Sequence, residues 1–98
     1  FATRACSPRP PRQANIKPML PLANLLIVDL SRVLACPFAT MILAELGATV
    51  IKVEHPTAGD ETRGFEPFFD FGVSGYFLAC NRGKRSICVD LRKPSGQA

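Results

Sequence analysis

Polar and charged side chains gather at three points where an apolar run of the sequence ends. The first is the turn SRVLACPFAT at residues 31–40, which follows the run LLIVDL and precedes a helix-like pattern. A helix N-terminus can hold a phosphate through its unpaired backbone N–H groups. The turn nevertheless lacks both the G-x-G-x-x-G and the G-x-x-x-x-G-K-[ST] signatures. The residue types alone therefore favour an ordinary strand-to-helix connection over a phosphate site.

The second polar group, EHPTAGDETRG, follows the apolar stretch at residues 48–54. It contains Glu54, His55, Asp60, Glu61 and Arg63. A general acid–base pair could be built from such side chains, since histidine as a residue type titrates near neutral pH. A loop whose charges neutralise one another is the commoner arrangement, and both interpretations stand at this point.

The third group is the basic stretch NRGKRSICVDLRKP at residues 81–94. Three cations precede a strand-like segment and two follow it: Arg82, Lys84, Arg85, Arg92 and Lys93. Cations at both ends of a strand could bracket a polyphosphate. A solvated basic loop is the simpler interpretation. An RNA-binding patch would need aromatic side chains among the charges, and this stretch has none.

The elements that must position these groups form a strand–helix–strand unit. Residues 25–30 are a continuous apolar run, typical of a strand covered on both faces. Residues 48–54 are rich in β-branched side chains and predict a second strand, parallel to the first, with a right-handed crossover between them. RSICVDL predicts a third strand after a long polar connection at residues 55–75.

The helix between the first two strands is predicted from Pro37, which suits a first helical turn. The segment PFATMILAEL places Phe38, Met41 and Ile42 on one face, and Gly47 follows as a C-terminal cap. YFLAC indicates one further helical turn, and Pro94 opens a last helix. The predicted fold class is α/β, with a βαβ unit plus a third strand.

The basic excess belongs to the N-terminal tail. Residues 1–20 contain Arg4, Arg9, Arg12 and Lys17 without any acid, whereas eight basic and eight acidic residues follow from Asp29 onward. This composition predicts a disordered tail, which is either the remainder of an organelle transit peptide or a plain basic linker.

The neutral body argues against a broad nucleic-acid-binding surface. No apolar run approaches the roughly 18 residues of a membrane span, so we expect no membrane association. The four cysteines show no C-x-x-C pair and no histidine at metal-ligand spacing, which favours reduced thiols over a metal site, although a disulfide is possible by count.

Five motifs in series resemble the N-terminal portion of the family III coenzyme A (CoA) transferases, the CaiB/BaiF family. In this chain they are DLSRVLACPFA, LGATVIKVE, GDETR, NRGKRSI and DLRKPSG, within residues 22–96. The resemblance is strongest toward the branch that moves CoA between succinyl-CoA and glutarate. It implies that residues 21–98 are a fragment of the CoA-transferase domain, a partial Rossmann-like parallel sheet truncated from a larger interlaced fold.

The resemblance also implies where CoA would lie. Val33, Leu34 and Ala35 would contact it, largely through their backbone. Cys36 replaces a glycine of the family motif, and if that glycine has a positive φ the cysteine would be strained by about 1 kcal/mol.

Two further places are implied as CoA contacts. His55 occupies a position at which the family has an arginine that contacts the nucleotide end of CoA, and a neutral imidazole would weaken that phosphate pairing. Four residues at the exit of the third strand would flank the adenine and the phosphates: Val89, Asp90, Leu91 and Arg92.

The family's catalytic aspartate lies beyond the matched segment. Asp29, Asp60 and Asp90 belong to motifs with structural or binding roles, so no catalytic residue and no metal ligand is predicted in this chain. CoA is a co-substrate and no cofactor is bound permanently. The implied partners are an acyl-CoA and a dicarboxylate, in a parent protein that is an interlaced homodimer of the mitochondrial matrix.

The chain is therefore interpreted as an N-terminal fragment of a CoA-transferase that is inactive by itself. Three alternatives stay open: a relative of acyl-CoA racemases, a truncated non-catalytic isoform, and a complete small domain.

Overall fold

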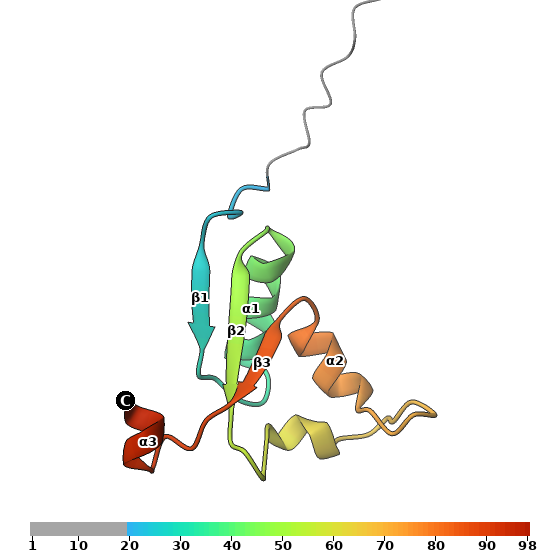
Figure 1. Cartoon of the computed structure of the whole chain (residues 1–98). Helices are drawn as coiled ribbons and strands as arrows, with labels where there is room; N and C mark the ends of the chain where they lie inside the picture. The colour runs from blue at the N-terminus through green and yellow to red at the C-terminus, as the bar shows by residue number, and fades with distance from the viewer. Residues whose placement is uncertain (1–19) are drawn as a thin grey trace, which may run out of the picture.

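The computed structural model describes residues 20–98, and the tail predicted from residues 1–20 lies almost wholly outside them. The described elements follow one another along the chain (Figure 1): β1 (Leu26–Asp29), α1 (Ala35–Glu45), β2 (Thr49–Glu54), the 3-10 helix η1 (Glu61–Gly64), α2 (Gly75–Asn81), β3 (Arg85–Cys88) and α3 (Pro94–Gln97).

The three strands form one parallel sheet in the order β1-β2-β3. Val28 of β1 lies opposite Ile51 of β2, and Val53 of β2 lies opposite Ile87 of β3. The predicted βαβ unit and third strand are therefore confirmed. Because the strands are parallel, their carboxyl ends all lie at the same edge of the sheet.

Helix α1 connects β1 to β2 and packs behind the sheet in the view of Figure 1. It begins at Ala35, slightly before the predicted start, and Pro37 is buried in its first turn. Of the predicted apolar face, only Met41 is buried, while Phe38 and Ile42 are exposed. Gly47 ends the helix with a φ of +106°, where a side chain would collide with Leu20.

The long connection after β2 has helical structure of its own. It contains η1, and Ser74 then caps α2 by accepting a hydrogen bond from the backbone N–H of Phe77 at 3.2 Å. Helix α2 packs on α1 and buries Phe77 and Cys80. The third strand ends at Cys88, three residues earlier than predicted, whereas α3 begins at Pro94 as predicted.

The two faces of the sheet differ. On β2, Val50, Lys52 and Glu54 point toward the helices and are buried, whereas Ile51 and Val53 on the other face are half-buried. Among the described helices only α1 packs on the sheet. The expectation that β1 is covered on both faces is therefore wrong for this structure, because no described element covers the face opposite α1.

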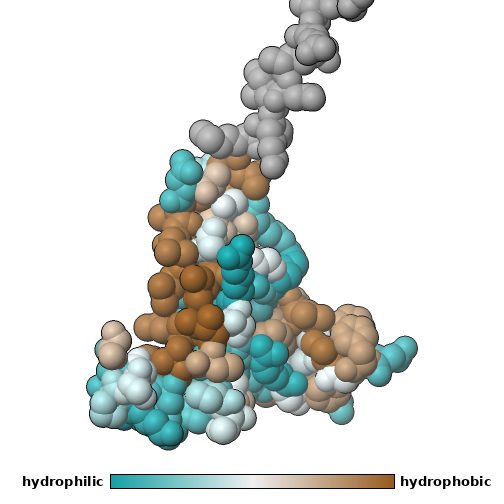
Figure 2. All heavy atoms as spheres, in the orientation of Figure 1, coloured by the Kyte–Doolittle hydropathy of each residue, from teal (hydrophilic) through white to brown (hydrophobic). Residues whose placement is uncertain are grey.

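That uncovered face is apolar. Leu26 and Val28 are 62% and 60% exposed, and Ile87 lies farther along the same face. Figure 2 shows the resulting hydrophobic surface over the sheet, with hydrophilic residues below it.

Candidate functional site

A cavity of about 430 Å³ lies at the carboxyl ends of the three strands. Residues 30–32 line it after β1, His55 after β2, and Val89, Leu91 and Arg92 after β3. Residues 52–54 at the end of β2 and the segment 58–60 before η1 complete the wall. In open parallel sheets ligands bind outside the carboxyl ends of the strands, so this cavity is the candidate site.

Four of the eight predicted CoA contacts line the cavity: His55, Val89, Leu91 and Arg92. Asp90 stands beside it, and its carboxylate accepts a hydrogen bond from Nε of Arg92 at 3.1 Å. The three turn residues 33–35 do not line the cavity themselves. They follow directly on Arg32, which does. The fold thus brings two of the three implied contact regions, His55 and residues 89–92, into one cavity wall, and contact with CoA stays a prediction for all three.

His55 and Arg92 lie against each other in the cavity wall. Nδ1 of His55 accepts from the backbone N–H groups of Thr57 and Ala58, both at 3.3 Å. Nε2 of the same ring lies 2.6 Å from Nη2 of Arg92, whose guanidinium only donates. A guanidinium is a permanent cation, so this part of the wall can pair with an anion.

Glu54 is buried in the cavity wall, and both of its carboxylate oxygens accept hydrogen bonds. Arg63 donates to both of its carboxylate oxygens at 2.7 Å, and Ser86 donates at 2.6 Å. The hydrogen bonds from Arg63, acting against burial, hold the pKa of Glu54 below its ordinary value. Arg63 is also stacked over the ring of Phe77, 3.8 Å from its centre. This loop therefore contains charges that satisfy one another rather than a free acid–base pair.

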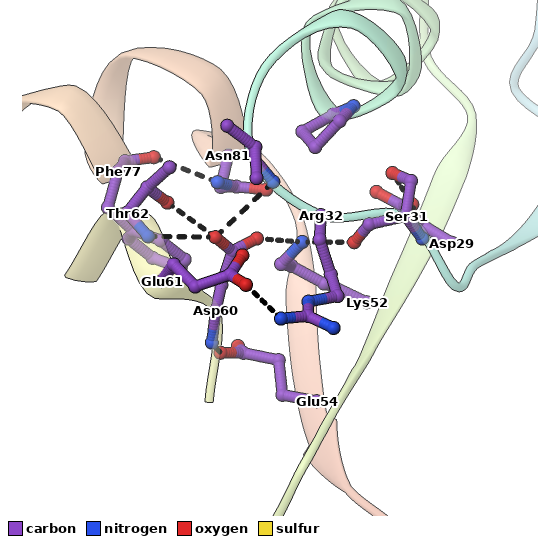
Figure 3. A network of polar contacts seen from close by, with 12 residues as sticks. Asp29, Ser31, Arg32, Lys52, Glu54, Asp60, Glu61, Thr62, Phe77 and Asn81 are labelled. Carbon is purple, nitrogen blue, oxygen red and sulfur yellow. Dashed lines mark hydrogen bonds and ion pairs between the residues drawn. The ribbon is translucent and has the colours of Figure 1, made fainter. Parts of the chain in front are cut away.

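Lys52 and Asp60 form a second ion pair, which the sequence did not indicate (Figure 3). Their side chains are 1% and 0% exposed, and Nζ of Lys52 lies 2.8 Å from Oδ2 of Asp60. Burial by itself raises the pKa of Asp60, but hydrogen bonds from Lys52 and Thr62 outweigh it, so the pKa lies below its ordinary value. The one available signal was a lysine at a position that alternation along β2 places on the same face as Val50.

The basic stretch at residues 81–94 does not act as one unit. Lys84 is only 2% exposed and donates three hydrogen bonds of 2.8 Å, to Asp29, to the carbonyl of Pro37 and to the side chain of Asn81. Arg82 pairs instead with Glu45 of α1 on the surface. The idea that these cations jointly bracket a polyphosphate is wrong, because only Arg92 among the five lines the cavity.

The strained residue of the first turn is Val33, not Cys36. Cys36 lies in the first turn of α1 and is exposed, whereas Val33 has a φ of +68°. A β-branched residue is rarely found in this left-handed region. The expected strain at Cys36 is therefore absent, because the helix begins before this position.

The thiols of Cys36, Cys80 and Cys88 are free. Within residues 20–98, no three His, Cys, Asp or Glu side chains gather as a metal site would require. The helices described in that same range are all too short or too polar to cross a lipid bilayer.

The sequence and the fold both match known proteins. A family model described as CoA-transferase family III matches residues 22–98. The chain is 54% identical over 84 residues to succinyl-CoA:glutarate CoA-transferase of Mus musculus, and 48% identical over 90 residues to succinate--glutarate CoA-transferase of Agrobacterium fabrum. Each of these alignments covers 86% of this chain.

The structure is similar to that of a CAIB/BAIF family protein from Brucella suis, with a TM-score of 0.71 and 48% identity over 79% of this chain. The chain covers only part of each protein: 19% of the mouse relative, 22% of the Agrobacterium relative and 21% of the Brucella structure. It therefore spans about a fifth of the length of the relatives that it matches.

Proposed function

The chain belongs to CoA-transferase family III, and from this membership we propose that it supplies part of the site that holds coenzyme A. The observation that carries the proposal is the composition of the cavity wall. One part of it has the Arg92 guanidinium beside His55, and another is apolar, from Leu30, Val89 and Leu91. CoA has the matching parts, because its phosphates are anionic and its adenine has apolar faces.

The turn between β1 and α1 would add backbone contacts. Helix α1 has no side-chain cap at its N-terminus, and its N-cap residue is Leu34. The first N–H groups of the helix are thus left to other acceptors, and anions are favoured at such a position by the helix dipole. This supports the assignment of Val33, Leu34 and Ala35 to the CoA site.

For the whole protein we propose transfer of CoA between succinyl-CoA and a free dicarboxylate such as glutarate. The names of the mouse and Agrobacterium relatives support this choice. The same proposal includes an acyl-CoA and a dicarboxylate as substrates, no permanently bound cofactor, and an interlaced homodimer as the assembly.

The 98-residue chain is proposed to be inactive by itself. Acyl transfer by a carboxylate needs a free nucleophile, and the two carboxylates that line the cavity, Glu54 and Asp60, are held in ion pairs with Arg63 and Lys52. A purified chain incubated with succinyl-CoA and glutarate should give no turnover above background. Glutaryl-CoA formation would overturn this part of the proposal.

We also propose that residues 1–20 direct the protein to the mitochondrial matrix, because they combine three arginines with an absence of acids. A fluorescent protein carrying this segment behind a start methionine should be imported. Replacing Arg4, Arg9 and Arg12 by Glu should abolish import, and import of both versions would reject the targeting role.

Calorimetric titration of the chain with CoA tests the central proposal. We expect saturable binding that Arg92→Ala weakens by roughly threefold to tenfold, because a charge-assisted contact is lost. Arg82→Ala removes the same charge outside the cavity and should leave the affinity unchanged. Absence of binding by the unaltered chain, or equal losses in the two variants, would contradict the assignment.

A further inference from the structure

The turn that follows β1 is held from two sides by one buried ion pair. Nζ of Lys52 donates to the carbonyl of Ser31 at 2.9 Å and lies 2.8 Å from Oδ2 of Asp60. The other oxygen of Asp60 faces the backbone N–H of Val33 at 3.4 Å. Figure 3 shows the two side chains meeting between the turn, β2 and η1. The pair therefore bridges three segments that belong to different parts of the sequence.

Asp60 is itself fixed in place. Its Oδ1 accepts from the backbone N–H and the hydroxyl of Thr62, at 3.0 and 2.7 Å, and its own N–H donates to Glu54 at 3.1 Å. Its Oδ2 lies 2.8 Å from the Lys52 ammonium and accepts no other hydrogen bond from the described residues. The carboxylate therefore has little freedom to move, and the groups that it contacts, Lys52 and the backbone N–H of Val33, are held in place with it.

Val33, which this pair contacts, has an unfavourable backbone conformation, with a φ of +68°. A left-handed conformation at a valine persists only where the surroundings impose it. The contacts at Ser31 and Val33 lie on either side of Arg32, whose own side chain meets Glu61 of η1 on the surface. The surroundings that fix the turn are therefore Lys52, Asp60 and the η1 segment.

We propose that Lys52 and Asp60 are positioning residues of the CoA site. Both belong to the cavity wall, and their charged groups act by fixing the backbone of residues 31–33. This rests on the proposed function, because the turn is assigned there as a backbone contact of CoA. Lys52 cannot reach a ligand with its charge, since its ammonium is buried and already directed at two acceptors. Its contribution to affinity is made through the turn.

The test removes both charges together, because removal of one leaves the other buried and unpaired. The variant is Lys52→Met with Asp60→Asn. Its control is Val50→Ala, which shortens a buried side chain on the same face of β2 and does not touch the turn. Both are compared at a temperature where circular dichroism shows them to be folded. If the double variant does not fold, Lys52→Gln with Asp60→Asn replaces it, because this pair also removes both charges and keeps polar groups at both positions.

Two measurements decide the proposal. We expect the double variant to bind CoA about tenfold more weakly, while Val50→Ala stays within about twofold of the unaltered chain. Amide hydrogen exchange at residues 31–33 should become at least about tenfold faster in the double variant and change little in the control. Equal loss of affinity in the two variants, or unchanged exchange in the turn, would overturn the positioning role.

The two proposals can fail separately. If the unaltered chain does not bind CoA, the proposed function fails, and the exchange measurement still decides whether the pair fixes the turn. If CoA binds and the double variant keeps full affinity, the CoA site stands and the positioning role is wrong.

Discussion

Lys84 and Asp29, 55 positions apart in the chain, meet in a buried ion pair with 2.8 Å between Nζ and Oδ2. The same ammonium also binds the carbonyl of Pro37, and the same carboxylate accepts from the hydroxyl of Thr40 at 2.7 Å. The pair therefore ties the end of β1 to α1 and to the start of β3. Lys84 of the NRGKRS stretch therefore stabilises the fold, and its ammonium is not available to a ligand.

Lys84→Met should accordingly be one of the most damaging single changes. It leaves the Asp29 carboxylate buried without its cationic partner, which typically costs about 3–5 kcal/mol. The loss is measured as the shift of a urea unfolding curve followed by circular dichroism. Arg82→Ala, which breaks an exposed pair with Glu45, should cost less than about 1 kcal/mol. Similar small losses in both variants would show that the Lys84 pair contributes little.

Acid should unfold the chain through three carboxylates. Hydrogen bonds and ion pairs hold the pKa of Asp29, Glu54 and Asp60 below the ordinary values, although burial opposes this at each of them. The folded state then binds fewer protons than the unfolded state as the pH falls toward about 4. The free energy of unfolding should thus be constant from about pH 7 to 5 and decrease progressively below about pH 4.

The measurement is urea unfolding across that pH range at two salt concentrations. Because Asp29 and Asp60 are buried with their partners, added salt should change the neutral-pH stability little. A stability that increases on acidification would contradict the sign of these pKa shifts.

Val33→Gly should stabilise the chain. A left-handed valine is unfavourable by about 1–2 kcal/mol, and the greater freedom of glycine in the unfolded state offsets about 0.5–1 kcal/mol of the relief. The expected net gain is therefore about 0.5–1 kcal/mol in urea unfolding. Val73 has no positive φ, so Val73→Gly serves as the control and should destabilise. Destabilisation by both changes would mean that Val33 is not strained.

Cys36 offers a test in which the sign of the effect identifies the backbone conformation. Inside a helix, Cys36→Ala should stabilise by a few tenths of a kcal/mol and Cys36→Gly should destabilise by a similar amount. At a position with positive φ the order would be reversed, with glycine the better residue. Thermal unfolding of the two variants distinguishes these cases.

Local patterns predicted the elements of this fold but not the contacts between them. The continuous apolar run at residues 25–30 and the β-branched run at 48–54 are both features of the local sequence, so both strands and the βαβ unit were predictable. The approach of Lys84 to Asp29 depends on the packing of α1 and α2, and no local pattern encodes it. The same applies to the buried charge of Lys52, since a lysine in a strand ordinarily suggests a solvent-facing side.

The site was predictable only in part for a related reason. His55, Val89, Leu91 and Arg92 follow the ends of strands, and parallel strands bring such positions together. The sequence placed the backbone strain at Cys36 because this cysteine stands where the family motif has a glycine. In the structure α1 already begins at Ala35, so Cys36 is helical and the left-handed residue is Val33. The boundary of a helix is the part of the element that a sequence predicts least well.

The uncovered face of the sheet should make the isolated chain associate. Leu26, Val28 and Ile87 expose apolar side chains there, and β1 and β3 are both edge strands among the described residues. Sedimentation at increasing protein concentration should show oligomers that Val28→Lys reduces. Phe71→Lys places the same charge on an exposed aromatic outside the sheet and should have less effect. A chain that stays monomeric at all concentrations and unfolds in one sharp transition would show that this face needs no cover.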